Sequence, residues 1–265
     1  MRRHYRGIQG VRLMKKALVL SYMGSAYHGW QRQKNVSTIQ QTVEEAIERL
    51  TGQSVYVSGC GRTDAGVHAR YYVASVAVDT TIPDLRLPAA LNAHLPEDIA
   101  VSKCVTVPDD FDARFSCINK EYTYVIHNSR TRNPFLLRQA CFYPQHLDEQ
   151  AMNEAAKHLI GKHDFAALKS EGTPVKSTVR TIMECSAERE GDIVRVRARA
   201  DGFLYNMVRT IAGTLMYVGI GKLTPDDMPR VLASCDREQA GPTAPACGLY
   251  MTSVCYGMEE LDGKK

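Results

Sequence analysis

A short glycine-rich stretch contains three side chains that could do chemistry together. In Gly61-Arg62-Thr63-Asp64-Ala65-Gly66-Val67-His68-Ala69, a carboxylate, a guanidinium and an imidazole lie close along the chain. The glycines allow the backbone to approach a ligand closely. An Asp in such a loop can act as a nucleophile or general base where a cation keeps it ionised. The alternative from residue types alone is a turn Asp that caps its own backbone.

The cysteines do not predict a second site. The chain has eight, with no Cys-x-x-Cys pair among them, so neither a zinc site nor any other metal site is expected. A disulfide framework does not suit a chain of this length without a secretory signal. We therefore expect reduced thiols, most of them packed in the core.

Composition places the chain among globular, cytoplasmic proteins. Its 265 residues are 44% hydrophobic, which excludes a disordered chain. The best apolar run, 17–20, is far shorter than the roughly 18 residues of a membrane span. The basic N-terminus has no apolar segment behind it, so no signal peptide is expected. These features predict a cytoplasmic protein that does not cross a membrane.

Positive charge gathers at the beginning of the chain. Eight Lys and Arg residues precede Glu44, the first acidic residue. This asymmetry suggests a polyanionic partner. However, residues 1–13 read as a basic N-terminal extension, and Met14 is a candidate natural start. Without residues 1–13 the net charge falls from +4 to zero, so whole-chain charge is a weak argument for nucleic acid.

Hydrophobic periodicity predicts strands and helices in two halves of mixed α+β type, 14–110 and 111–265. We expect strands at 16–22, 54–58, 72–78, 99–107, 121–127, 179–188, 193–200 and 249–256. We expect helices at 38–50, 85–92, 148–160, 203–218 and 224–233, with Thr38 and Asp148 as N-caps. Each half resembles a split βαβ unit, and we expect the two sheets to join.

The glycine-rich stretch resembles the catalytic-loop signature of the bacterial tRNA pseudouridine synthase A (TruA) family. Further blocks resemble the same family in the same order, from Lys16 to Tyr256. These blocks include Gly29-Trp30-Gln31-Arg32-Gln33, Phe111-Asp112-Ala113-Arg114-Phe115-Ser116, Lys120-Glu121-Tyr122-Thr123-Tyr124, Gly202-Phe203-Leu204-Tyr205, Met207-Val208-Arg209 and Gly248-Leu249-Tyr250.

The resemblance implies a pseudouridine synthase fold, in which two ferredoxin/RRM-like halves join into a mixed, mainly antiparallel sheet flanked by helices. It implies an isomerase that converts uridine to pseudouridine at positions 38, 39 and 40 of the tRNA anticodon stem-loop. It implies tRNA as the partner, a homodimer, and no cofactor or metal.

The resemblance also implies roles for five residues. Asp64 matches the catalytic aspartate, and Arg209 matches the basic residue that pairs with it. Tyr122 matches the tyrosine that stacks on the target base. Arg62 matches the loop arginine that helps to displace the target nucleotide, and Leu249 matches an apolar residue of the base pocket.

Each of these roles has a structural alternative. Arg209 could be a surface helix residue, and Arg62 could contact a carboxylate of its own loop. Tyr122 and Tyr124 face one side of a strand and could both be core residues. We expect His68 to hydrogen-bond the loop rather than contact RNA, and Trp30 to order its loop by packing.

Alternatives for the whole protein also stay open. A non-catalytic RNA-binding protein would have RRM-like halves, and a glycosidase-like hydrolase would need a second carboxylate. Within the family chemistry, Asp64 could attack the sugar, attack the base, or abstract a sugar proton to form a glycal. Candidates for phosphate contacts are Arg32, Lys34, Arg70, Arg114, Lys120, Arg130, Arg132 and Lys169.

Overall fold

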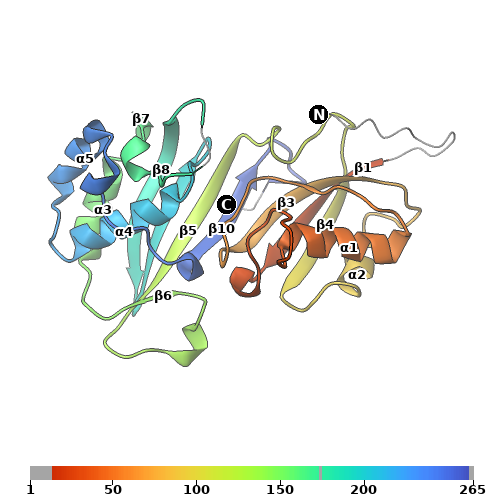
Figure 1. Ribbon diagram of the computed structural model, residues 1–265, viewed down its shortest axis with the longest axis horizontal. Helices are drawn as coiled ribbons and strands as arrows, with labels where there is room; N and C mark the ends of the chain where they lie inside the picture. The colour runs from red at the N-terminus through yellow and green to blue at the C-terminus, as the bar shows by residue number, and fades with distance from the viewer. Residues whose placement is uncertain (1–13, 173–174, 263–265) are drawn as a thin grey trace.

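The computed structural model describes residues 14–172 and 175–262, and its strands form one sheet in the order β4-β1-β3-β10-β5-β9-β8-β7 (Figure 1). Two short strands lie off this path, with β2 pairing β3 and β6 pairing β5. The strands are β1 (Met14–Tyr22), β2 (Ser58–Gly59), β3 (His68–Val78), β4 (Ile99–Thr106), β5 (Asn119–Asn128), β6 (Cys141–Tyr143), β7 (Gly161–Asp164), β8 (Val179–Glu190), β9 (Ile193–Ala200) and β10 (Leu249–Cys255).

Helices pack on the sheet in both halves of the chain. They are α1 (Ile39–Thr51), α2 (Leu87–Asn92), α3 (Glu149–Lys157), α4 (Met207–Gly219) and α5 (Met228–Ser234). Figure 1 shows α1 and α2 beside β1, β3 and β4, and α3, α4 and α5 beside the strands from β5 to β8. The predicted mixed, mainly antiparallel α+β sheet is confirmed. The division at residue 110 stays a prediction.

The last strand, β10, joins the two parts of the sheet. It pairs in parallel with β3, where Tyr250 lies opposite His68, and antiparallel with β5, where Leu249 lies opposite Tyr124. The predicted joining of the sheets is therefore confirmed. Because the glycine-rich stretch leads directly into β3, the joint brings this stretch beside β5 and β10 at the centre of the molecule (Figure 1).

Both predicted N-caps are confirmed. The Thr38 side chain accepts a hydrogen bond from the Gln41 backbone N–H at the start of α1, and Asp148 accepts one from Ala151 at the start of α3. Such caps satisfy donors that the first helical turn leaves unpaired. The apolar positions of α1 then face the core, with Ile39, Val43, Ala46 and Ile47 buried.

The strand predicted at 54–58 is wrong for most of its length. Only Ser58–Gly59 pairs with β3. The backbone of Val57 is instead bonded to side chains of α1: its N–H donates to Glu44 Oε1, and its C=O accepts from Gln40 Nε2. Alternating residues predict a strand, but these polar side chains of a neighbouring helix take the place of a strand partner.

Two helices begin later than predicted. The helix predicted from 203 starts at Met207, because Asn206 has a left-handed backbone with φ 58° that interrupts the helical path. The helix predicted from 224 opens as a 3₁₀ turn at Pro225–Asp227 and becomes α-helical at Met228. The late start of α4 leaves 203–206 free to line a cavity. None of the helices in the described ranges is both long and apolar enough to cross a bilayer.

Candidate active site

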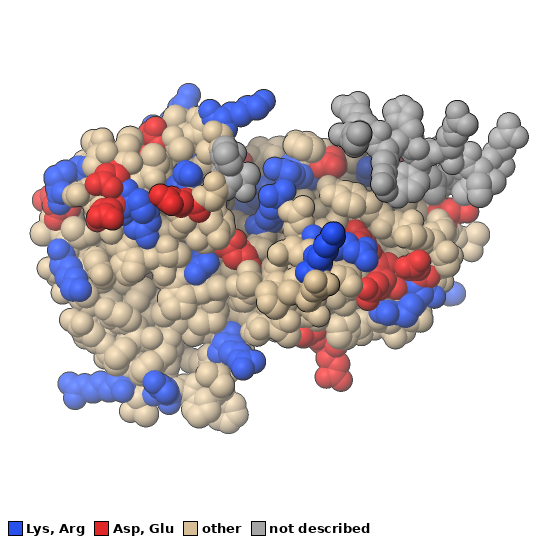
Figure 2. Space-filling model, viewed as in Figure 1, with Lys and Arg blue, Asp and Glu red and all other residues tan. Residues whose placement is uncertain are grey.

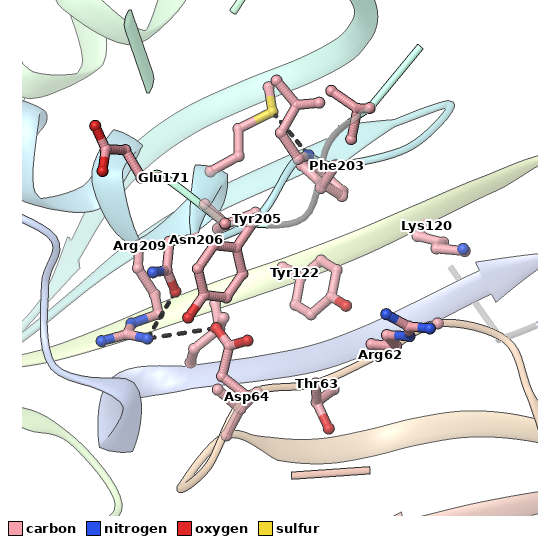
Figure 3. Close-up of a pocket in the computed structure, with 18 of the residues that line it drawn as sticks. Arg62, Thr63, Asp64, Lys120, Tyr122, Glu171, Phe203, Tyr205, Asn206 and Arg209 are labelled. Atoms are coloured by element: carbon pink, nitrogen blue, oxygen red, sulfur yellow. Dashed lines mark hydrogen bonds and ion pairs between the residues drawn. The ribbon is translucent and has the colours of Figure 1, made fainter. Parts of the chain in front are cut away.

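The five residues assigned by resemblance all line one cavity of about 640 Å³ at the joint of the sheet (Figure 3). They come from the glycine-rich loop, β5, α4 and β10, and they are Arg62, Asp64, Tyr122, Arg209 and Leu249. Residues 203–206 and Glu171 complete much of the remaining wall. The fold thus gathers groups that are far apart in sequence.

An ion pair joins Asp64 to Arg209. Nη1 of Arg209 lies 3.4 Å from Oδ2 of Asp64, and the side chains are 17% and 31% exposed for Arg209 and Asp64 respectively. The pair has a single contact rather than the two parallel contacts of a bidentate arrangement. Arg209 is therefore not a surface helix residue, and its guanidinium is directed at the carboxylate.

Two further groups hold the Arg209 guanidinium in place. Nε donates to the Ala244 carbonyl oxygen at 2.8 Å, and Nη1 donates to Asn206 Oδ1 at 2.8 Å. The amide nitrogen of Asn206 donates in turn to Ser170 Oγ at 3.1 Å. Figure 3 shows Asn206 and Asp64 both linked to the guanidinium. Arg209 is thus oriented before any substrate arrives.

The segment that supplies Ala244 crosses α4 at very close range. A Cβ on Gly213 would lie 1.8 Å from the Pro242 carbonyl oxygen. The backbone N–H of Ala244 also donates to the Arg209 carbonyl oxygen at 3.1 Å. Only glycine at position 213 permits this approach, and the approach places a carbonyl beside Arg209 Nε.

Burial and charge act in opposite directions on Asp64. Burial raises the pKa of the Asp64 carboxyl, whereas the charge and hydrogen bond of Arg209 lower it, and the net pKa is above its ordinary value. Arg209 favours the ionised carboxylate, in the direction expected from sequence. Burial is nevertheless the larger effect, so Asp64 is a more basic carboxylate than one in water.

Tyr122 and Tyr124 have different surroundings although they lie on one face of β5. Tyr124 is fully buried and donates its hydroxyl to the Pro245 carbonyl at 2.7 Å, so it is a core residue. Tyr122 is 7% exposed and lines the cavity. Its ring packs edge to face against that of Phe203, with the ring centres 5.2 Å apart. Burial raises the pKa of Tyr122 well above its ordinary value, which keeps its hydroxyl protonated.

Arg62 is exposed at the cavity and is not paired with a carboxylate of its own loop. Ion pairs within residues 14–172 and 175–262 do not include it. Figure 3 shows Arg62 and Lys120 on the side of the cavity away from Arg209. Leu249 is buried at the start of β10 and supplies an apolar part of the wall.

Buried side chains next to the loop that contains Asp64 make contacts that fix its position. His68 is fully buried; its Nδ1 accepts from the Gly24 N–H at 3.0 Å, which leaves Nε2 to donate to the Cys247 carbonyl at 3.2 Å. Trp30 is buried and stacks on Tyr72 with ring centres 4.3 Å apart. The structural interpretations of both His68 and Trp30 are confirmed.

Comparison with known proteins identifies the family. The family model described as tRNA pseudouridine synthase matches residues 18–116 and 155–257. The chain belongs to the tRNA pseudouridine synthase family. The tRNA pseudouridine synthase A of Acetivibrio thermocellus is 47% identical over 240 residues, which cover 90% of this chain and 98% of that protein. Its counterpart in Ruminiclostridium cellulolyticum is 42% identical over 246 residues, covering 92% and 100% respectively.

The tRNA pseudouridine synthase family was predicted from ordered motifs, and that prediction is confirmed. The motifs did not assign a role to Tyr205, which ends one quoted block, or to Asn206, which lies between that block and Met207-Val208-Arg209. Tyr205 lines the cavity and is 49% exposed, and Figure 3 shows its side chain directed toward Asp64. A signal for Asn206 was its residue type, since Asn adopts left-handed backbone more readily than most residues.

Proposed function

We propose that this protein converts uridine to pseudouridine in tRNA, at positions 38, 39 and 40 of the anticodon stem-loop, with Asp64 as the catalytic carboxylate. The single observation that carries the proposal is the Asp64–Arg209 pair in a cavity walled by Tyr122, in a chain of the tRNA pseudouridine synthase family. The anticodon positions rest on the resemblance of the motifs.

The reaction is an isomerisation with balanced atoms. The bond between ribose C1′ and uracil N1 breaks, the base turns, and a bond forms between C1′ and C5. The C5 proton leaves and N1 gains a proton, so no oxidant or reductant is consumed. An ionised Asp64 suits nucleophilic attack at the sugar or base, and equally proton abstraction from the sugar.

The remaining cavity residues suit the handling of a detached base. Tyr122 offers an aromatic face and Leu249 an apolar wall, which together favour a stacked base over its escape into water. A uridine inside a stem must first leave the stack, which costs a few kcal/mol. Arg62, exposed beside the cavity and free of a loop carboxylate, is placed to occupy the space that the base leaves.

A glycosidase-like reaction fits this cavity less well. Such a reaction needs a second carboxylate that acts across the bond from the first. Glu171 is the other carboxylate of the wall, but Figure 3 shows its carboxylate directed away from Asp64. Measuring free uracil in the reaction mixture distinguishes hydrolysis from isomerisation.

The test uses purified protein and an unmodified tRNA transcript with uridines at positions 38 to 40. Pseudouridine is mapped by carbodiimide labelling and primer extension, with Asp64→Ala and Asp64→Asn run beside the original protein. We expect new stops at these positions that both variants abolish. Activity that survives in the variants would remove Asp64 from the mechanism, and tight binding without stops would favour an RNA-binding module.

The homodimer and the cytoplasmic location follow from the resemblance and the composition, and we propose both. All five assigned residues lie in one chain, so a single subunit supplies this cavity. The second subunit would then hold another part of the tRNA. Light scattering coupled to gel filtration measures the mass in solution, and a monomer at micromolar concentration would contradict the homodimer.

A further inference from the structure

The cavity holds three cations besides Arg209. Arg62, Lys120 and Arg114 all line it. The ion pairs found within 14–172 and 175–262 include none of these three. In Figure 2, basic side chains border the hollow at the centre of the face. Their charges are therefore available to a ligand.

Lys120 is the most confined of the three cations. It is half-buried on β5, two positions before Tyr122, so both side chains leave the same face of the strand. A Cβ on Gly61 would lie 3.4 Å from Lys120 Nζ, so the absence of a side chain at Gly61 keeps the space beside the ammonium open. Its positive charge also lowers the pKa of the nearby Cys60 thiol, although burial outweighs this effect.

A half-buried ammonium group beside a cavity favours an anionic ligand. Removing a charge from water without a partner is unfavourable. Asp64 lines the same cavity, but its carboxylate is already paired with Arg209. The neighbours Arg62 and Arg114 are also cations, and they come from different segments of the chain. Three cations that line one cavity suit a phosphodiester, for which lysine serves as a point charge and arginine as a hydrogen-bonding fork.

We propose that Lys120, assisted by Arg114, binds a backbone phosphate of the RNA immediately beside the target nucleotide, while Arg62 keeps its role at the space that the base leaves. This inference rests on the proposed function, because it assigns one part of the same RNA substrate. The phosphate contact holds the backbone at the cavity mouth while the base lies against Tyr122. Lys120 is then a substrate-positioning residue, and it takes no part in bond making at C1′.

The first experiment replaces Lys120 with Met, which keeps the length of the side chain without its charge, and with Arg, which keeps the charge. Lys157→Met, on the exposed surface of α3 outside the cavity, is the matched control. We expect Lys120→Met to raise KM for an anticodon stem-loop RNA about tenfold, with kcat nearly unchanged. Lys120→Arg should restore most of this loss, and Lys157→Met should cause none.

The second experiment identifies the phosphate. A set of stem-loop RNAs carries one neutral methylphosphonate at a time, at each linkage around the target uridine. One of these replacements should weaken binding by the original protein about tenfold and weaken binding by Lys120→Met clearly less, because only the assisting arginine still faces that phosphate. Equal sensitivity of the two proteins at every linkage would overturn the proposal.

Two further measurements separate a failure of the Lys120 contact from a failure of the proposed function or of folding. Filter binding measures the RNA complex without turnover, so the Lys120 contact is tested even if no pseudouridine forms and the proposed function fails. Thermal unfolding checks the variants: Lys120→Met should be at least as stable as the original, because it removes an unpaired half-buried charge. If Lys120→Met unfolds normally and also binds the RNA normally, the phosphate contact is refuted.

Discussion

Asn206 connects a left-handed turn to the proposed reaction centre, and its replacement tests how Arg209 is positioned. Asn206 has φ 58° and accepts a hydrogen bond from Arg209 Nη1 at 2.8 Å. The substitution Asn206→Gly removes the amide but keeps a residue that adopts left-handed backbone without strain. Any change in activity can then be attributed to the lost contact rather than to a distorted start of α4.

The expected fall in kcat follows from the hydrogen bond that Arg209 loses and the one that it keeps. A hydrogen bond to a charged group contributes about 1.5–3 kcal/mol. Arg209 keeps its bond to the Ala244 carbonyl at 2.8 Å, so it stays near the cavity but is free to turn away from Asp64. If that contribution is lost from the transition state, kcat falls roughly 10- to 100-fold. The effect on KM should be small, because Asn206 acts through Arg209 rather than on the RNA.

The pH dependence of activity gives an independent test of this role, because the direction of its shift can be predicted. Arg209 lowers the pKa of Asp64 against the larger effect of burial. A less well oriented Arg209 lowers it less, so the pKa of Asp64 rises further. Activity that needs the ionised carboxylate is lost as pH falls through this pKa. The acid limb of the Asn206→Gly profile should therefore lie at higher pH than that of the original protein.

The assay is single-turnover release of tritium from RNA labelled at uracil C5, because that hydrogen leaves when the new carbon–carbon bond forms. Asn35→Gly is a matched control, since Asn35 is also left-handed at φ 64° but is exposed and outside the cavity. The control should behave like the original protein. A normal rate and an unshifted acid limb in Asn206→Gly would refute the positioning role.

Three other substitutions test the same site. Arg209→Met should lower kcat at least 100-fold and shift the acid limb to higher pH, measured by the same tritium release, because Asp64 loses its only ion-pair partner in the described chain. Asp64→Asn should raise the thermal unfolding temperature at neutral pH, because folding disfavours the ionised carboxyl whose pKa is raised; the gain should shrink as pH falls and the Asp64 carboxyl becomes protonated. Gly29→Ala should destabilise the protein by about 1–3 kcal/mol in urea unfolding, since φ is 82° and the new Cβ would lie 2.2 Å from the Thr63 carbonyl oxygen; an unchanged midpoint would contradict this reasoning.

Local sequence signals predicted much of the secondary structure. The caps at Thr38 and Asp148 and the strand Ile193–Ala200 depend on residue types within a few positions, and all three are confirmed. The strand predicted at 54–58 failed because Gln40 and Glu44 bond to the Val57 backbone from a neighbouring helix. Period-two alternation contains no information about such a contact.

The candidate site was predictable in its members but not in its geometry. Motif resemblance named Asp64 and Arg209, which are 145 positions apart in the chain. It did not indicate that their contact is single and 3.4 Å long, or that Asn206 helps to orient the guanidinium. These features depend on where the backbone turns at 206 and on how closely 242–244 crosses α4.

The family, the α+β class and the residue types that any chemistry must use could all be read from the sequence, because motifs and hydrophobic periodicity are properties of the linear chain. Which charges meet, and which remain without a partner, depends on how the chain folds. β10 brings the two parts of the sheet together, and their joint buries Asp64 beside Arg209 while leaving Lys120 facing an open cavity. Burial and distance set the pKa of Asp64, and both arise from contacts between segments that are remote in sequence.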